Sequence, residues 1–276
     1  MNSYVTYHLH SDLSLLDSCT KYQDYINLAV QNKQPAIAFT EHGNIFQWVE
    51  KKLYCDSQGI KYIHGVECYL TESLDTKIRD NYHTILLAKN EAGIREINSL
   101  VSVSYQDDHF YYKPRITFDE FFRVSPNVIK ISACLASPLR RLDVGNLTYD
   151  KLCHHYDYFE IQPHNHPDQI AYNRQLYQLS IRYDKPLIAG TDTHSLNPYK
   201  AECRKILMMA KHIGYTDEDA FDLSYKTYDE LVEMFHKQDA LPEQTWLQAI
   251  ENTLVMAGSV EDFKLDTSFK YPVLHG

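Results

Sequence analysis

Short apolar runs alternate with amphipathic stretches along most of the chain. Seven runs rich in β-branched and aromatic residues predict strands, at residues 4–7, 36–39, 62–66, 84–88, 128–132, 158–161 and 187–189. Between them, residues 22–32, 45–57, 91–104 and 169–183 repeat apolar side chains at helical spacing. This repeated order of strand and helix predicts a mainly parallel sheet. It favours a closed α/β barrel over the alternative, an open doubly wound sheet.

The pattern changes after Asp192. Residues 199–211, 228–236 and 245–258 predict helices with no strand between them. No repeat, low-complexity tract or Pro/Gly/Ser-rich linker marks a second independent domain. We therefore expect a barrel over residues 1–198 and a helical extension over residues 199–276 that packs on the same domain.

Composition narrows the possible functions. The 276 residues include 27 Lys and Arg against 37 Asp and Glu, a formal net charge of -10 that argues against an extended nucleic-acid surface. Glycine is scarce at 9 residues, and neither a GxxxxGK[ST] nor a GxGxxG phosphate loop occurs. The six cysteines form no CxxC pair and the N-terminus has no apolar signal core, so we expect a reducing, cytoplasmic setting. No apolar run approaches the ~18 residues that a membrane span needs.

Potential metal ligands gather where the predicted strands end. His8 and His10 are two residues apart, as are Asp192 and His194, and in an extended segment this spacing aims both side chains the same way. His42 follows the run 36–39, and Glu67 follows the run 62–66. Each motif alone is more typical of surface or hydrogen-bonded residues. Together, at the end of the strands where barrel enzymes carry their chemistry, they predict a metal site.

The order of several segments resembles one known family. These segments are HLHSDLSLLDS, AIAFTEHGN, GVECYL, YHTILLAKNEAG, FYYKPRI, ISACLASPLRRL, YFEIQPH, GTDTHSLNP and AIENTLVMA. Over about residues 3–265 the chain resembles the PHP (polymerase and histidinol phosphatase) family, in particular the N-terminal PHP domain of bacterial DNA polymerase III alpha subunits. The resemblance implies a distorted (β/α)7-type TIM-like barrel. The polymerase palm is not expected within this chain, which leaves open a free-standing protein, a piece of a split polymerase and a truncated chain.

The resemblance also implies a site for three divalent metal ions. It assigns the first ion to His8, His10, Glu67 and Asp192, the second to Glu67, His83 and Cys134, and the third to Asp17, His42 and His194. Nitrogen, oxygen and sulfur ligands together suit Zn, Mn or Fe better than Mg. His83 starts its apolar run instead of ending it, which suggests that the strand limits assigned there are misplaced. Glu41 stands where the family more often has Asp, so a supporting contact or a proton relay is expected to differ.

The function implied is phosphoester hydrolysis by a metal-bound hydroxide. The polymerase branch of the family favours a 3′ to 5′ exonuclease that acts on DNA ends. His8, His10, Glu67, Asp192 and His194 are the expected catalytic residues. The alternatives are a phosphatase for a small phosphomonoester and a non-catalytic module that docks onto a separate DNA polymerase or replisome subunit.

Substrate contacts are expected from cationic and aromatic residues near these segments. Lys113, Arg115 and Arg140, with Arg141, are candidates to grip flanking phosphates, and Tyr111 or Tyr112 to stack on a base. The alternative is that the cations form surface ion pairs. Four further histidines match no ligand position, and of these His164 is a candidate for contacts behind the ligands; they are His154, His155, His164 and His166. Since the ligand carboxylates would bind cations, any affinity for nucleic acid is expected to depend on the metals.

Overall fold

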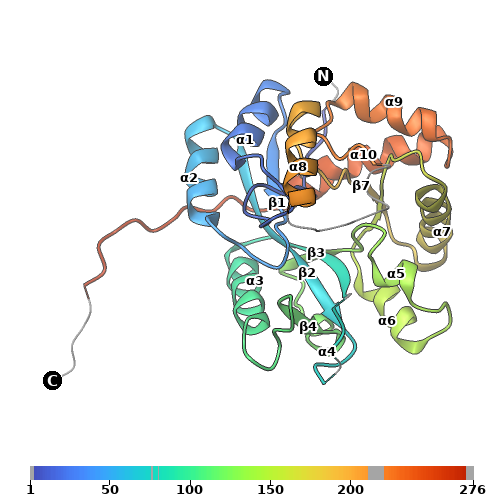
Figure 1. Cartoon of the computed structure of the whole chain (residues 1–276), viewed down its shortest axis with the longest axis horizontal. Helices are drawn as coiled ribbons and strands as arrows, with labels where there is room; N and C mark the ends of the chain where they lie inside the picture. Colours follow the sequence, from blue (N-terminus) through green and yellow to red (C-terminus); the bar gives the residue numbers. More distant parts are fainter. Residues whose placement is uncertain (1–2, 76, 80, 211–220, 272–276) are drawn as a thin grey trace.

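The computed structural model describes residues 3–75, 77–79, 81–210 and 221–271, which form a mixed α/β fold (Figure 1). The strands are β1 (Ala36–Phe39), β2 (Lys61–Thr71), β3 (Tyr82–Ala88), β4 (Arg115–Thr117), β5 (Val128–Ile131), β6 (Phe159–Ile161) and β7 (Leu187–Ala189). The helices are α1 (Tyr22–Gln31), α2 (Trp48–Gln58), α3 (Glu91–Ser104), α4 (Phe118–Phe121), α5 (Pro138–Arg141), α6 (Leu147–His155), α7 (Pro167–Tyr183), α8 (Pro198–Ala210), α9 (Tyr228–Gln238) and α10 (Glu243–Gly258). None of the helices within these ranges is long and apolar enough to cross a membrane.

Backbone contacts connect the strands into a barrel-like ring. The order β1-β2-β3-β5 forms one sheet, and β6 pairs with β7 in parallel. Two irregular joints complete the ring. A parallel bridge between Ile131 and Tyr158 joins β5 to β6. The N-terminal segment lies between β1 and the end of β7, because Thr6 O accepts from Ala38 N at 3.1 Å and Leu9 bridges Thr193. The expected barrel is thus present, but residues 4–7 form no regular strand.

One strand runs against the others. β3 is antiparallel to both of its neighbours in the ring, β2 and β5. Its beginning therefore lies at the end of the barrel where the parallel strands finish, and His83 lies opposite Tyr69 in the register. The limits expected from the run 84–88 were too short at the start, since β3 begins at Tyr82 and includes His83; the reversed direction of the strand explains why His83 comes first.

The interior of the barrel changes from apolar to polar along each strand. One buried cluster contains Ala36 and Ala38 of β1, Ile63 of β2, Ile85 and Leu87 of β3 and Ile188 of β7. Because side chains alternate between the two faces of a strand, the same inner face continues to His42 after β1, Glu67 in β2 and Asp192 after β7. The apolar residues fill one end of the barrel, and the predicted metal ligands occupy the other.

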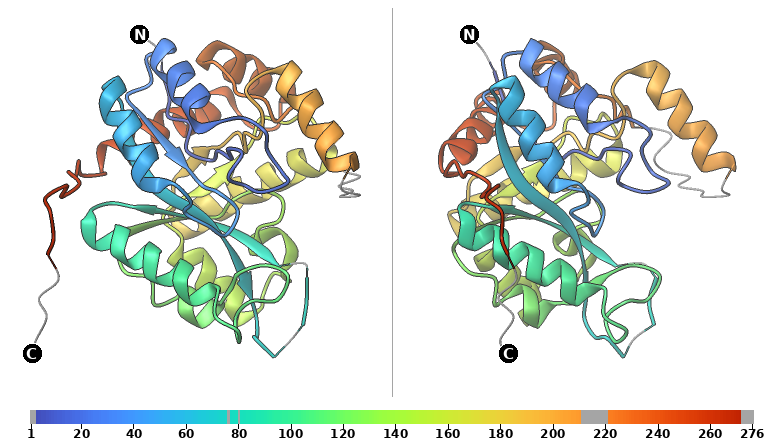
Figure 2. Two further views of the ribbon diagram at one scale, coloured as in Figure 1. Left: turned by 60° about the vertical axis from the view of Figure 1, so that its left-hand side comes forward. Right: turned by 90° about the vertical axis from the view of Figure 1, so that its left-hand side faces the viewer.

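Helices cover the outside of the ring and close its apolar end. Met256 and Ala257 of α10 belong to the interior cluster, and Val5 N donates to the Thr253 hydroxyl at 2.9 Å. Leu231 and Phe235 of α9 share a second cluster with residues of β6 and α7. Figure 2 shows that α8, drawn in orange, projects from the body, whereas α9 and α10 lie against it.

The long helices and most strands agree with the sequence pattern. The helix expected at 45–57 begins later, at Trp48, and α4, α5, α6 and β4 were not expected. Lys211, expected at the end of a helix, lies outside the described residues. The division at residue 198 remains a prediction, although the core shared by α9, α10 and the barrel favours a single cooperative unit.

That shared core can be tested at Ile250, which is 1% exposed in α10. We expect Ile250→Ala to cost about 2–5 kcal/mol of unfolding free energy because it leaves a cavity in the common core. The whole chain should still unfold in a single transition, as measured by denaturant titration with both far-UV CD and tryptophan fluorescence. Val255→Ala, on the exposed side of the same helix, is the control and should change stability little. Two separate transitions would contradict one shared core.

Candidate metal centre

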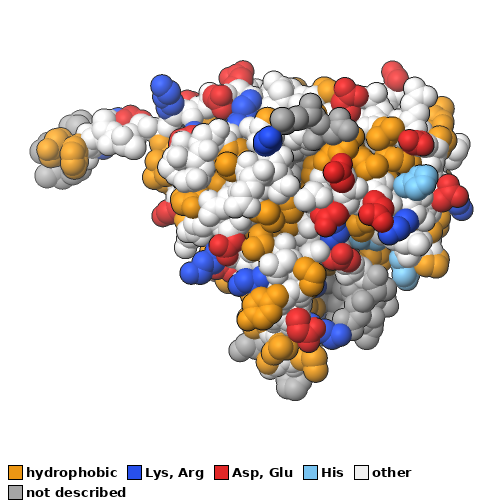
Figure 3. Space-filling view, turned by 90° about the horizontal axis from the view of Figure 1, so that it is seen from above, with side chains coloured by type: hydrophobic (Ala, Val, Ile, Leu, Met, Phe, Trp, Pro, Cys, Tyr) orange, Lys and Arg blue, Asp and Glu red, His pale blue; other side chains and the backbone are white. Residues whose placement is uncertain are grey.

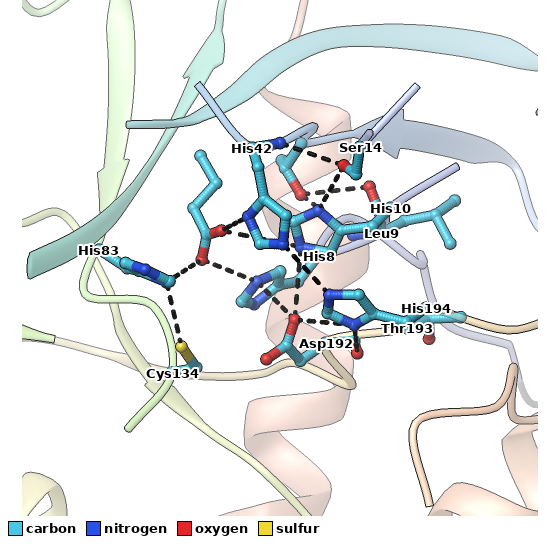
Figure 4. A network of polar contacts seen from close by, with 12 residues as sticks. His8, Leu9, His10, Ser14, His42, His83, Cys134, Asp192, Thr193 and His194 are labelled. Carbon is cyan, nitrogen blue, oxygen red and sulfur yellow. Dashed lines mark hydrogen bonds and ion pairs between the residues drawn. The ribbon is translucent and has the colours of Figure 1, made fainter. Parts of the chain in front are cut away.

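The predicted ligands converge at the polar end of the barrel. His8 and His10 come from the N-terminal segment. His42 lies shortly after β1, Glu67 lies within β2 and His83 lies within β3. Cys134 follows β5, and Asp192 and His194 follow β7. Figure 4 shows the imidazole rings of these histidines pointing toward one another, with Cys134 beyond His83. The structure therefore brings residues that lie as far apart in the sequence as His8 and His194 into one cluster.

A single buried carboxylate, that of Glu67, lies at the centre of the cluster. Its Oε1 is 3.3 Å from His8 Nε2 and 3.1 Å from His83 Nδ1. Its Oε2 is 2.6 Å from His42 Nδ1 and 3.9 Å from His10 Nε2. One side chain thus faces four imidazoles, as a carboxylate shared between neighbouring cations would.

Asp192 forms the second centre, from the other side of the ring. Its Oδ1 lies 3.1 Å from His8 Nε2, 3.3 Å from His10 Nε2 and 3.5 Å from His194 Nδ1. Asp192 has a φ of +47°, and Ala133, next to Cys134, has a φ of +61°. Left-handed backbone at non-glycine residues carries strain that tends to accumulate at functional sites. Here both positions coincide with, or directly precede, a candidate ligand.

Among the described residues, three overlapping groups of side chains are close enough to hold ions. They are His8 with His10 and Glu67, Glu67 with His83 and Cys134, and His10 with His42 and His194. The second group is the set that the resemblance assigns to one ion. In the third, His10 occupies the place assigned to Asp17, because its ring stacks against those of both His42 and His194, with ring centres 4.1 and 4.3 Å apart. Asp17 stays adjacent, with its Oδ2 2.8 Å from His42 Nε2.

The cluster contains buried polar atoms that lack hydrogen bonds. Among the described residues, His8 Nε2, His10 Nε2 and Asp192 Oδ1 are buried and have no hydrogen-bond partner. Leaving such atoms unpaired costs free energy. Ligands of a tetrahedral Zn ion at 2.0–2.2 Å lie roughly 3.4 Å from one another, and the separations of 3.1 and 3.3 Å between these atoms are similar. The donor set and its spacing therefore fit divalent metal ions.

The charges in the cluster depend on one another. Burial disfavours the charged form of Glu67, but His83 and His42 outweigh it and hold the pKa of that carboxyl well below its usual range. Burial also lowers the pKa of His42, yet Glu67 and Asp17 raise it to about 10. Burial, with two imidazoles nearby, lowers the pKa of His10 to about 3. The extra proton on His42 must leave before a cation binds there, so metal affinity should fall with falling pH.

A second buried carboxylate, which sequence reasoning missed, orients His8. The Nδ1–H of His8 donates to Glu160 Oε1 at 2.7 Å, so its Nε2 presents a lone pair to the cluster. The Tyr7 hydroxyl donates to the other carboxylate oxygen at 2.8 Å, and the Gln162 amide donates to Oε1 at 2.7 Å. Gly190 makes room for this carboxylate, since a Cβ there would lie 2.3 Å from Glu160 Cδ. The signal in the sequence was a lone acidic residue within the apolar run 158–161.

Glu41 supports His10 through a serine. The Ser14 hydroxyl donates to Glu41 Oε2 at 2.6 Å and lies 3.1 Å from His10 Nδ1. Lys51, from α2, donates to Glu41 Oε1 at 2.7 Å, and both side chains are buried. The longer carboxylate noted in the sequence thus contacts a ligand indirectly, as part of a buried ion pair.

Asp17 is held by the helical extension. Its Oδ1 pairs with the Arg204 guanidinium of α8, and the Asp17 backbone carbonyl accepts from Arg204 Nε at 2.6 Å. Arg204 is only 8% exposed. The first helix after the barrel therefore fixes one candidate ligand.

The cluster opens into a cavity of ≈330 Å³. Lys113, Arg140 and Arg141 line it, and their role as substrate contacts stays a prediction. Lys113 Nζ lies 4.3 Å from the centre of the Tyr69 ring, and Arg140 pairs with Asp168 at 3.3 Å. Neither Tyr111 nor Tyr112 is part of the described lining.

The structure gives Arg115 a different place from the one expected. It is 1% exposed and does not belong to the lining of the cavity. Its guanidinium donates to His109 O at 2.9 Å and to Leu74 O at 3.2 Å. The prediction that Arg115 contacts the substrate is therefore wrong. Its role is structural, because its hydrogen bonds connect the loops beside β4.

Comparison with known proteins links this chain to one family. The model described as PHP domain matches residues 6–161. The DNA polymerase III alpha subunit of Borreliella burgdorferi is 32% identical over 98% of this chain and 24% of its own length, and that of Aquifex aeolicus is 28% identical over 97% and 25%. The chain thus spans about a quarter of the length of these relatives. A solved structure from Bifidobacterium adolescentis, described as a candidate metal-dependent phosphoesterase, covers 71% of this chain with a TM-score of 0.50 at 15% identity, which shows a shared fold.

The role of Glu160 can be tested by metal binding. We expect Glu160→Gln to weaken divalent metal affinity by about 10–100-fold, because the amide no longer fixes the tautomer of His8. Competition with a chromogenic chelator measures that affinity. The control is Glu120→Gln, which alters a carboxylate that contacts His109 at 2.9 Å, away from the cavity. Equal losses in the two variants, or none in Glu160→Gln, would contradict the role of Glu160.

The Glu41–Lys51 pair predicts a pH-dependent stability. Burial raises the pKa of Glu41, but Lys51 and the serine hydroxyls outweigh it and bring the pKa to about 2. The pKa of a Glu side chain in the unfolded chain is about 4.3, so above that pH the ionised carboxylate of Glu41 stabilises the fold. This stabilisation is lost as the pH falls toward 2, where the carboxylate takes up a proton. We expect Lys51→Met to cost about 3–5 kcal/mol at neutral pH, since it strands a buried charge, and the difference from wild type to shrink below pH ~4.

Denaturant titrations from pH 7 to pH 3 measure this difference. Lys52→Met is the matched control, because Lys52 pairs with the half-exposed Asp56 on the same helix and should cost under ~1 kcal/mol. The buried pair would not stabilise the fold in this way if the loss of unfolding free energy in Lys51→Met stayed constant across this pH range, or if it were no larger than the loss in the control.

Proposed function

The chain belongs to the PHP family, and from that premise we propose that it is a metal-dependent phosphoesterase that hydrolyses phosphodiester bonds at the 3′ ends of DNA. The observation that carries the proposal is the arrangement of three overlapping ligand groups around Glu67 at the base of an open cavity. Two of these groups share Glu67, and two share His10. Such sharing suits neighbouring ions that act on one phosphate.

We assign the ions to the residues that the geometry and the resemblance favour. His8, His10, Glu67 and Asp192 would hold one, Glu67, His83 and Cys134 a second, and Asp17, His42 and His194, beside His10, a third. When bound, divalent ions neutralise phosphate oxygens and lower the pKa of a coordinated water. The mixed donors favour Zn, Mn or Fe. Burial, with Asp192 and Glu67 nearby, raises the pKa of the Cys134 thiol, so it must lose its proton to act as a ligand.

Residues of the cavity would position the substrate. Lys113, Arg140 and Arg141 line the cavity and can bind the non-bridging oxygens of the reacting and flanking phosphates. Leu135 and Phe221 give the same lining an apolar part that limits the access of water. The ligand histidines and carboxylates keep their orientation through Glu160, Ser14 and Arg204, so little reorganisation is needed when a phosphate enters.

The charge of the molecule favours action on a strand end. On the face seen from above in Figure 3, basic side chains are interspersed with acidic ones and form no broad basic surface. With a net charge of -10, an extended duplex would be repelled over much of the surface. One terminal phosphodiester can still reach the cavity, where metal ions, when bound, together with three cationic side chains would reverse the local sign of the charge.

DNA as the substrate rests on the polymerase subunits to which the chain is similar. We expect the protein, loaded with Mn or Zn, to release mononucleotides from a 3′-labelled strand. Asp192→Asn should lower that rate by at least about a hundredfold with the fold intact, because it removes a ligand charge beside His8 and His10. Asp150→Asn is the control, since Asp150 contacts Tyr183 at the surface, away from the cavity.

Hydrolysis of small phosphate esters and binding to a polymerase subunit distinguish the two alternative functions, a phosphatase and a docking module. Release of phosphate from small monoesters without release of nucleotides would indicate a phosphatase. A metal-loaded protein that hydrolyses neither substrate, yet forms a stable complex with a polymerase subunit that is indifferent to Asp192→Asn, would indicate a docking module and would overturn the proposal.

A further inference from the structure

Part of the cavity wall, outside the metal ligands, also carries polar atoms without partners. His164 is 3% exposed, and within the described ranges neither of its ring nitrogens has a hydrogen-bond partner. Gln169 is 1% exposed, and its Oε1 likewise lacks one. Both residues line the cavity that contains Asp192 and His194. These atoms are therefore available to a molecule that enters the cavity.

The position of His164 is fixed by its surroundings. Gln238 of α9 donates its side-chain amide to His164 O at 2.6 Å and to Gln162 O at 2.9 Å. Asn173 of α7 donates to Gln162 O at 2.8 Å and accepts from the Gln169 amide at 2.9 Å. These amides hold the backbone of His164 and the side chain of Gln169 in place. Their unpaired atoms are thus presented on a rigid wall.

Another buried histidine shows what a purely structural role looks like. His64 is 1% exposed, yet its Nδ1 lies 3.1 Å from the Tyr62 hydroxyl and its Nε2 lies 2.8 Å from Asn98 Oδ1. Burial lowers the pKa of both His64 and His164 to about 4, so both rings are neutral near pH 7. The two histidines match in burial and in charge and differ in whether their nitrogens are paired. A neutral ring offers one donor and one acceptor, and only His164 keeps both unused.

The chemistry of this wall differs from that of the metal-ligand side. His164 and Gln169 offer hydrogen bonds without charge, and Phe221 packs edge-on against His164 with ring centres 5.0 Å apart. A phosphate would bind more strongly to the cationic side chains and candidate metal ligands elsewhere in the cavity. The uncharged groups suit hydroxyl, carbonyl or amide groups, such as those of a sugar or a base. The cavity of ≈330 Å³ falls within the range typical of small-ligand sites, ~300–1,000 Å³.

We propose that His164 and Gln169 form a nucleoside subsite, which hydrogen-bonds the sugar or base of the terminal nucleotide while its phosphate lies at the metal-ligand cluster. This inference rests on the proposed function and adds the part of the substrate that the protein recognises. The subsite would let the protein distinguish a nucleotide from a simpler phosphate ester.

Binding measurements test the subsite without relying on turnover. The probes are methylphosphonate and the phosphonate analogue of thymidine 5′-monophosphate, neither of which a phosphoesterase cleaves. We expect metal-loaded wild type to bind the nucleoside phosphonate more tightly in calorimetric titrations. His164→Phe, which keeps the ring and removes both nitrogens, should weaken that binding about tenfold and leave methylphosphonate within about twofold. Its melting temperature should equal or exceed that of wild type, since no protein hydrogen bond is lost.

His64→Phe is the matched control. It should lower the melting temperature, because it breaks two hydrogen bonds, and should leave the ratio of the two affinities unchanged. Equal affinities of wild type for both probes would overturn the subsite. So would equal losses for both probes in His164→Phe, or unchanged affinity for the nucleoside phosphonate. The proposed function fails separately, if wild type binds metal and these probes but hydrolyses no phosphoester.

Discussion

The buried carboxylate of Glu67, with four imidazoles directed at it, is the interaction on which the rest of this structure depends. These imidazoles come from three separate parts of the barrel, the N-terminal segment, the turn after β1 and the start of β3, so the cluster forms only when these parts come together. A buried carboxylate and several buried imidazoles are costly unless they neutralise one another or share cations. That requirement explains why the cluster is surrounded by a second set of polar contacts, through Glu160, the Glu41–Lys51 pair and Arg204.

Stability and chemistry are divided between the two ends of the barrel. At one end, apolar residues of the strands and of α10 fill the interior. At the other end lie left-handed backbone at Asp192 and Ala133 and several buried polar atoms without partners in the described part of the chain. Strain and unpaired polar atoms reduce stability, and proteins tolerate them where a ligand compensates. The same reasoning connects the metal-ligand cluster with the wall formed by His164 and Gln169.

Much of the candidate site could be predicted from the sequence. Local spacing at strand ends predicted one part of it, and the resemblance to the PHP family implied the rest, namely Asp17, His83 and Cys134. Pairs two residues apart at strand ends, such as His8 with His10, share a face wherever the segment is extended. What the pattern could not provide was the direction of β3, since an apolar run looks the same in either direction; only pairing with β2 and β5 reveals it. The burial of Arg115 and the partner of Glu160 also depend on contacts between distant segments.

The cluster accounts for part of the acidic composition of the chain. Three of the carboxylates that make the net charge -10 lie among the candidate ligands, where cations would offset them. The most direct test of this account is therefore elemental analysis of the purified protein by inductively coupled plasma mass spectrometry after exchange into metal-free buffer. The account predicts about three transition-metal ions per chain, reduced in a Glu67→Gln variant because two ligand groups share that carboxylate. A folded wild-type protein that retains no metal, and takes up none when Zn or Mn is supplied, would contradict it.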